Sequence, residues 1–90
     1  AAMVLSAQTA DDVDAFARAV GEAAPHGDGV EVFGPAPAPI SVLRGRHRRR
    51  FLVQTPKSVD LSAYMAAWRG RVKTPGTARL SIDIDPYSFL

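Results

Sequence analysis

Two segments of helical periodicity, each preceded by a strand-like run, most constrain what this chain of 90 residues can fold into. In residues 13–24 and again in residues 61–72, apolar side chains recur every three or four positions, which is the spacing of one helix face. Thr9 precedes the first segment as a helix N-cap, and Ser58 or Asp60 can cap the second. The sequence therefore predicts two amphipathic helices.

Four short segments have the pattern of strands. They are residues 2–7, 30–34, 50–55 and 78–86, and the last of them alternates apolar and polar side chains. The resulting order is strand, helix, strand, strand, helix, strand, which two split βαβ units produce. We therefore expect an α+β fold of the ferredoxin-like βαββαβ type, with a four-stranded antiparallel sheet and both helices on one face.

The composition is that of one small globular domain, and we take residues 1–90 as a single domain. Apolar residues make up 47% of the chain and charged ones 22%, which is too apolar for a disordered tail. No apolar stretch approaches the roughly 20 residues that span a bilayer, and the N-terminus lacks the layout of a secretory signal. We expect a cytoplasmic protein without membrane contact. Because there is no cysteine, a disulfide scaffold and a thiolate metal site are excluded.

Prolines at positions 35, 37 and 39 directly follow the second strand-like segment. A proline has no backbone N–H to give to a strand ladder, so a central strand cannot run through them. We expect this stretch to be a stiff, extended connector that leads into the next segment.

Five arginines and a histidine follow that connector. They are Arg44, Arg46, His47, Arg48, Arg49 and Arg50. Since the net charge of the chain is +2 and these arginines carry five positive charges, the remaining residues carry about three negative ones. A localised positive charge attracts a polyanion, and guanidinium groups bind phosphate oxygens with a planar fork. The segment is therefore a candidate phosphate-binding site; the alternative is a solvated hairpin edge whose charge prevents strand addition.

Strand alternation predicts how these side chains divide. Arg46, Arg48 and Arg50 are expected on one side of the strand, and His47 and Arg49 on the other. A phosphate-bearing groove could then be held from two sides.

The open face of the sheet is expected to lack the aromatic side chains that stack on bases. The positions assigned to it are Arg50, Leu52, Gln54, Ser81, Asp83 and Asp85. None of these is aromatic, and their carboxylates would repel a nucleic-acid strand laid across the sheet. We therefore expect contact with a phosphate backbone rather than base recognition across the sheet.

Catalytic and metal chemistry find little support in the sequence. Asp83 and Asp85 have no histidine or third carboxylate beside them, and no phosphate-binding loop, metal-ligand spacing or nucleophile with a matched base is present. The acylphosphatase loop, which uses an arginine on this fold, is also absent. Tyr64 and Trp68 lie on the apolar stripe of the second helix, which favours core packing. We expect no enzyme activity, no metal and no cofactor in this chain.

The segments VFGPAPAPISVLRGRHRRRFLVQTP and LSIDIDPYSFL resemble the C-terminal domain of the primosomal protein N′ (PriA) family of bacterial replication-restart DNA helicases. The resemblance covers essentially the whole chain and includes a proline motif, an arginine motif and a terminal Asp-x-Asp-Pro, in that order. The residues that match the proline motif and the Gly-Arg-x-Arg core are Gly34, Pro35, Pro37, Pro39, Gly45, Arg46 and Arg48. His47 stands where the family often has an aromatic residue.

This resemblance implies a non-catalytic domain at the end of an ATP-dependent 3′-to-5′ DNA helicase. The ATP, magnesium and zinc of the family would bind elsewhere in such a protein. The family's terminal domain is similar in fold to a small-subunit ribosomal protein and contacts branched or forked and single-stranded DNA, here through the arginine-rich segment and His47. It also contacts the helicase lobes and the acidic tail of single-strand DNA-binding protein, for which Lys57 is the candidate. The alternatives are a ribosomal-type RNA-binding module and an architectural domain that docks onto the helicase lobes.

Overall fold

Strands and helices follow one another along the chain in the order that the sequence predicts. The structure is a computed structural model and describes residues 1–84, apart from the side chain of Pro39. Its elements are β1 (Ala2–Ala7), α1 (Ala10–Glu22), β2 (Glu31–Leu43), β3 (Arg46–Gln54), α2 (Leu61–Gly70) and β4 (Arg79–Asp83). The predicted positions of Asp85 and Pro86 lie outside the described residues. No helix in residues 1–84 is long and apolar enough to cross a membrane.

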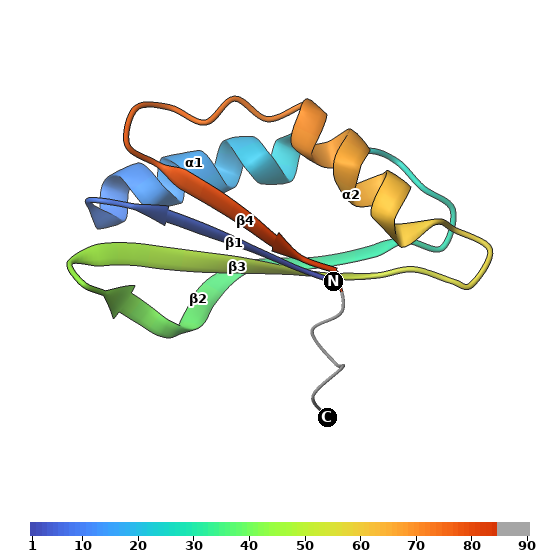
Figure 1. Cartoon of the computed structure of the whole chain (residues 1–90), viewed down its shortest axis with the longest axis horizontal. Coiled ribbons are helices and arrows are strands. Elements are labelled where there is room, and N and C mark those ends of the chain that lie inside the picture. Colours follow the sequence, from blue (N-terminus) through green and yellow to red (C-terminus); the bar gives the residue numbers. More distant parts are fainter. Residues whose placement is uncertain (85–90) are drawn as a thin grey trace.

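The strands form one antiparallel sheet in the order β2-β3-β1-β4, and both helices lie on the same side of it (Figure 1). The other side of the sheet carries no helix in the described part of the chain; we call it the open face. The predicted α+β architecture, with two helices and an antiparallel sheet, is confirmed.

The core lies between the helices and the sheet. Alternate residues of β1 and β3, among them Met3 and Phe51, are buried against the apolar stripes of both helices. Trp68 of α2 is fully buried, with its ring 5.5 Å from that of Phe51 in an edge-on arrangement. Its indole N–H donates to the carbonyl oxygen of Val20 at 2.8 Å, so this buried polar group is satisfied. The prediction that Tyr64 and Trp68 pack in the core is confirmed.

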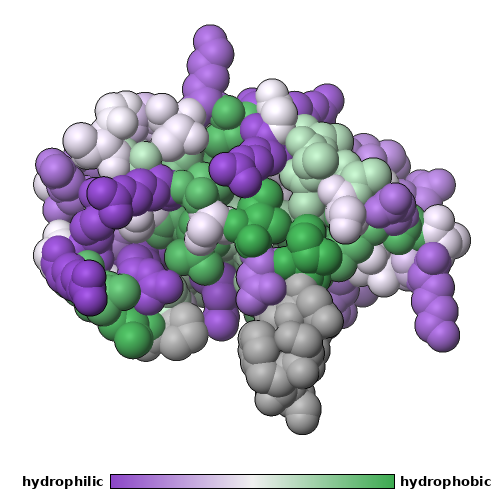
Figure 2. Space-filling model, viewed as in Figure 1, coloured by the Kyte–Doolittle hydropathy of each residue, from purple (hydrophilic) through white to green (hydrophobic). Residues whose placement is uncertain are grey.

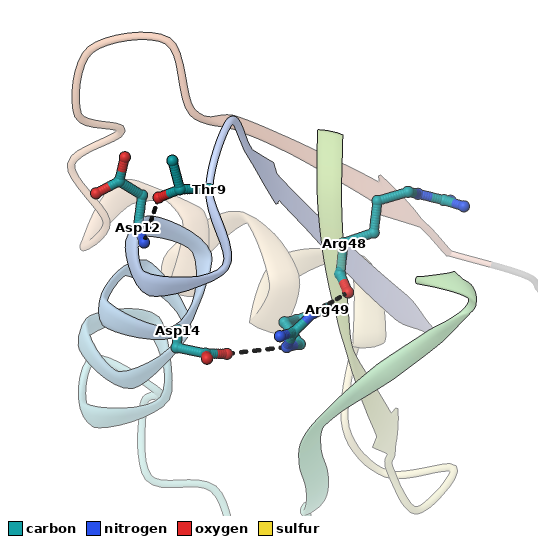
Figure 3. A network of polar contacts seen from close by, with 5 residues as sticks. All are labelled: Thr9, Asp12, Asp14, Arg48 and Arg49. Atoms are coloured by element: carbon teal, nitrogen blue, oxygen red, sulfur yellow. Dashed lines mark hydrogen bonds and ion pairs between the residues drawn. The ribbon is translucent and has the colours of Figure 1, made fainter. Parts of the chain in front are cut away.

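Each helix begins at a side-chain cap that the sequence indicates. The Thr9 hydroxyl accepts a hydrogen bond from the backbone N–H of Asp12 at 3.1 Å (Figure 3). The Asp60 carboxylate accepts one from the backbone N–H of Ala63 at 3.0 Å, so Asp60 rather than Ser58 caps α2. These bonds satisfy donors that a helix N-terminus otherwise leaves unpaired.

The prediction that the prolines form a connector outside the sheet is wrong, because β2 continues through positions 35, 37 and 39. Strand β2 lies at the edge of the sheet and has only β3 as a neighbour, so a proline on its outer side removes no ladder hydrogen bond. Its pairing with β3 is irregular between Phe33 and Ala36 and again between Pro37 and Val42. The edge position accounts for the prolines, which would break a central strand.

The turn between β2 and β3 consists of Arg44 and Gly45 alone. Their φ angles are 52° and 77°, and two positive values are what a type I′ hairpin turn requires. Such a short turn places the first arginine of β3, Arg46, directly opposite Leu43 of β2. The arginines from position 46 onward therefore lie in a strand, which begins four residues earlier than the sequence predicts.

Candidate nucleic-acid interface

The arginines of β3 divide between the two faces of the sheet. Met3 of β1 and Phe51 of β3 are register partners, and both point into the core on the helix side. Leu5 and Ala7 lie on that same side of β1. Their register partners, Arg49 and His47, therefore point to the helix side as well. The partners Ser6 and Arg48, and likewise Val4 and Arg50, point to the open face. The predicted alternation is confirmed by this register.

Arg49 is held against α1 on the helix side. Its Nε donates to the Oδ1 of Asp14 at 2.9 Å, and its Nη1 donates to the carbonyl oxygen of Arg48 at 2.9 Å (Figure 3). Only 18% of the Arg49 side chain is exposed. Its positive charge is thus compensated within the domain, and the structure does not bring Arg49 together with the arginines of the open face. His47 is half-buried on the same side as Arg49.

Arg46 is fixed by three hydrogen bonds to neutral acceptors. Its Nε donates to the Ser6 hydroxyl at 3.1 Å, and its Nη2 donates to the backbone carbonyl oxygens of Ser6 at 3.2 Å and Thr77 at 2.7 Å. Arg48 similarly donates from Nη1 to the carbonyl oxygen of Ile40 at 3.0 Å. These bonds orient the two guanidinium groups without neutralising their charge.

Arg79, the first residue of β4, joins this group, although the sequence pattern does not single it out. Both Arg48 of β3 and Arg79 of β4 are register partners of Ser6 in β1, so the two arginines flank Ser6 on the open face. They line a hollow of about 530 Å³ together with Ser6, Leu43, Arg44 and Arg46. The alternation of Arg79 with Ser81 and Asp83 indicates that Arg79 points outward, but only the pairing of β1 with β4 places it beside Arg48.

Five arginines therefore lie in one region without an acidic partner among the described residues. We call Arg44, Arg46, Arg48, Arg50 and Arg79 the arginine face. Within residues 1–84 the ion pairs join Arg49 to Asp14 and His26 to Asp28, and none involves the arginine face. Like charges held this close repel one another and create a local positive field. The positive field of the arginine face therefore favours the binding of an anion.

Apolar side chains accompany the arginines near the hairpin turn. Ile40, Val42 and Leu43 are 54%, 49% and 44% exposed. Figure 2 shows hydrophobic and hydrophilic side chains next to one another at this end of the molecule. The surface around the turn is thus mixed rather than purely charged.

The expectation of an open face without an aromatic side chain is wrong. Phe33 of β2 is 47% exposed and is the register partner of Leu52, whose neighbours Phe51 and Val53 point into the core. Phe33 therefore lies on the open face, on the same side as Arg50. The side on which Phe33 lies could not be assigned from the sequence, because Val30, Val32 and Phe33 place apolar side chains on both sides of the predicted strand and only the pairing with β3 shows which side faces the core.

The carboxylates of the open face lie at its other end. Asp83 is the partner of Ala2, as the predicted alternation requires, and Glu31 is the partner of Gln54 at the end of β3. The open face is therefore polarised along β3, with arginines near the hairpin turn and carboxylates at the opposite end.

Lys57 is exposed and lies in the loop between β3 and α2. Lys57 comes shortly after Gln54, the last residue of β3, whereas Arg46 of the arginine face is the first residue of that strand. A strand of nine residues spans about 30 Å, so Lys57 and the hairpin turn are at opposite ends of the sheet. The structure does not bring Lys57 together with the arginines.

Residues 1–84 contain no group of three His, Cys, Asp or Glu side chains that could hold a metal ion. On the helix side, burial raises the pKa of the Tyr64 hydroxyl, and the nearby charge of Arg71 opposes this effect in part. The hydroxyl donates to the carbonyl oxygen of Pro25 at 2.8 Å. This tyrosine therefore ties α2 to the loop after α1 and is separate from the arginine face.

Comparison with known proteins gives a consistent set of matches. Residues 1–87 match the family model described as the primosomal protein N C-terminal domain. Over 89 residues, or 99% of this chain, the sequence is 36% identical to the replication restart protein PriA of Rickettsia felis, 35% to that of Rickettsia conorii and 34% to that of Rickettsia prowazekii. The chain spans 14% of the length of each of these relatives.

Proposed function

The chain belongs to the family of primosomal protein N C-terminal domains, and from this premise we propose that it binds the phosphate backbone of branched or forked DNA through its arginine face. The relatives are named replication restart proteins, which supports DNA as the partner. The strand order β2-β3-β1-β4 is the order that two split βαβ units produce, and it supports a ferredoxin-like classification of the domain.

The observation that carries this proposal is the set of oriented but uncompensated guanidinium groups. Arg46 and Arg48 donate their hydrogen bonds to neutral oxygens, so both keep a full positive charge at the surface. A polyanion is the ligand that relieves the mutual repulsion of five such groups. Phosphate oxygens fit the guanidinium fork, and the release of counterions from DNA favours the contact further.

The geometry also redistributes the roles among the predicted residues. Arg44, Arg46, Arg48 and Arg50 stay in the proposed DNA contact, and Arg79 joins them. Arg49 and His47 point to the helix side, and Arg49 is engaged with Asp14. We therefore assign Arg49 to the stability of the domain rather than to DNA.

The whole protein is proposed to be an ATP-dependent 3′-to-5′ DNA helicase of the bacterial cytoplasm. Its ATP, magnesium and zinc sites would lie in parts of the protein that this chain does not contain, and this domain would be non-catalytic. Docking onto the helicase lobes, and capture of the acidic tail of single-strand DNA-binding protein near Lys57, are further proposed contacts. Lys57 is exposed and separate from the arginine face, so both could coexist with bound DNA.

The proposal is tested with the triple variant Arg48→Gln, Arg50→Gln and Arg79→Gln. Arg46 is kept, because its bonds to Ser6 and Thr77 also tie β3 to β1 and to the connection that precedes β4. Fluorescence anisotropy with a labelled fork at several salt concentrations measures both affinity and salt dependence. We expect weaker binding and a salt slope that is shallower by about 0.9 for each phosphate that the variant no longer neutralises.

A matched control carries the same change in net charge on the helices. Arg18→Gln, Arg69→Gln and Arg71→Gln replace three exposed arginines of the helical side. Equally weakened binding in the two triple variants would mean that only net charge matters, and an unchanged slope in the first variant would favour docking onto the helicase lobes. Preference for a hairpin RNA over the fork would instead favour the ribosomal-type RNA-binding alternative.

A further inference from the structure

We infer that the open face binds a single DNA strand in an extended form and stacks one of its bases on Phe33. This inference rests on the proposed function and names the DNA structure that the arginine face prefers. Its starting point is the exposed Phe33 on the same face as the uncompensated arginines.

The spacing of the arginines along β3 favours an extended strand. Arg46, Arg48 and Arg50 are each two residues apart, which is about 6.8 Å along a strand. The backbone of a duplex winds around its axis and advances only about 3.4 Å along that axis for each phosphate, so it curves away from a straight row of arginines. An extended single strand can follow the whole row with one phosphate at each arginine, and its bases are then free to leave their stack.

Phe33 offers a surface to one of those unstacked bases. It is 47% exposed, and its register partner Leu52 is two residues beyond Arg50 on the same face of β3. Arg50 and Phe33 are thus diagonal neighbours, which lie about 7–8 Å apart in an antiparallel pair. A phosphate on Arg50 would leave its base within reach of the Phe33 ring. Aromatic rings beside a positively charged groove are the usual means of holding single strands without sequence preference.

The polarity of the open face limits the length of the site. Glu31 lies beyond Phe33, at the end of the sheet away from the hairpin turn, where it is the partner of Gln54. Its carboxylate repels phosphates, so the bound strand runs along β3 from the turn and ends near Phe33. This corresponds to about four nucleotides, at the lower end of single-strand site sizes.

A duplex would use the same arginines but not the ring. Its bases are stacked and paired inside the helix, so they present no free face to Phe33. The Phe33 position therefore distinguishes the two modes of binding.

The test compares Phe33→Ala and Phe33→Trp in the 90-residue chain with the parent, using labelled oligothymidylate and a labelled duplex. Stacking of one base is worth a factor of about 5 to 150 in affinity, so Phe33→Ala should weaken single-strand binding by that much. Duplex binding should not change. Val42→Ala is the control, because Val42 is an exposed apolar residue of the same strand that points to the helix side; it should affect neither ligand.

Phe33→Trp should retain single-strand binding and supply a direct signal. Trp68 is fully buried and cannot contact the oligonucleotide, so a change in fluorescence on binding that is absent from the parent reports the new, exposed tryptophan. Stacking on thymine should quench it. Near-ultraviolet circular dichroism checks that each variant is folded.

The possible results separate this inference from the proposed function. If the parent binds DNA and the arginine variants weaken it, but Phe33→Ala binds oligothymidylate as tightly as the parent, the stacking inference alone is overturned. An unquenched Phe33→Trp at saturating oligonucleotide overturns it as well. If the parent binds neither ligand, the proposed function and the inference fail together.

Discussion

Gly34 lies in the edge strand close against the backbone of β3, and replacing it with alanine should destabilise the domain strongly. Its φ angle is +125°, a value that residues with a side chain rarely adopt. A Cβ atom at this position would lie 2.7 Å from the carbonyl oxygen of Arg50 and 3.2 Å from Cδ1 of Phe51. Both neighbours belong to the central strand β3 and cannot move aside easily.

The size of the effect follows from two contributions. Backbone strain at such an angle costs about 1–3 kcal/mol, and forcing an extra carbon into a packed site costs a further ~1–3 kcal/mol. Since 1 kcal/mol shifts the melting temperature of a domain of this size by about 4–8 °C, Gly34→Ala should lower it by about 10 °C or more. A marginally stable domain would lose a large part of its free energy of unfolding.

Thermal unfolding followed by circular dichroism measures the shift, and two other glycines serve as controls. Gly45 in the hairpin turn has a positive φ of 77°, but a Cβ atom added there would meet nothing beyond its chain neighbours within 4 Å, so Gly45→Ala should cost only the strain, about 1 kcal/mol. Gly70 at the end of α2 has neither a positive φ nor a close neighbour, so Gly70→Ala should stabilise by about 0.5 kcal/mol.

The order of the three melting temperatures is the decisive result. If Gly34→Ala melts no lower than Gly45→Ala, then β2 does not pack on Arg50 and Phe51 as closely as described. The placement of Phe33 next to Arg50 would lose its structural basis in the same experiment.

Two further predictions concern the helix side. A double-mutant cycle of Asp14→Ala and Arg49→Ala should give a coupling energy of about 0.5–1 kcal/mol, because Asp14 is largely exposed and solvent screens the pair. If Arg49→Ala made the salt dependence of fork binding shallower, the structural role assigned to Arg49 would be contradicted. Tyr64→Phe should cost about 1 kcal/mol, because it removes the hydrogen bond to Pro25. Because burial raises the folded-state pKa of Tyr64 above the unfolded value of about 10, its contribution to stability is present below that pH and is lost as the pH rises through the folded pKa. Chemical denaturation between about pH 9 and 11 should thus show a shallower alkaline loss of stability in Tyr64→Phe than in the parent, and identical profiles would refute this assignment.

Features that depend on neighbours in the sequence could be predicted well. Thr9 and one of the two candidate caps of α2 begin the helices, because a cap bonds to backbone groups only three residues away. The division of the arginines between two faces follows from strand alternation alone. The family resemblance also came from local motifs, and the family match confirms it.

Features that depend on the place of a strand in the sheet could not be predicted. The prolines of β2 indicate a connector unless the strand is known to lie at an edge. The exposure of Phe33 depends on the same fact, since its side becomes assignable only once β2 is paired with β3. Arg79 needed the pairing of β4 with β1 before it could be placed beside Arg48.

The sequence by itself determined that this chain carries a concentrated positive charge on a strand with two faces. Only the tertiary structure decided which of those charges remain available. Arg49 is neutralised by Asp14, which is 35 residues away in the chain, and Arg79 joins Arg48 across β1. An ion pair or a charge cluster requires groups within a few ångströms of one another, and such distances between remote residues are set by the packing of α1 and by strand register, not by the local pattern.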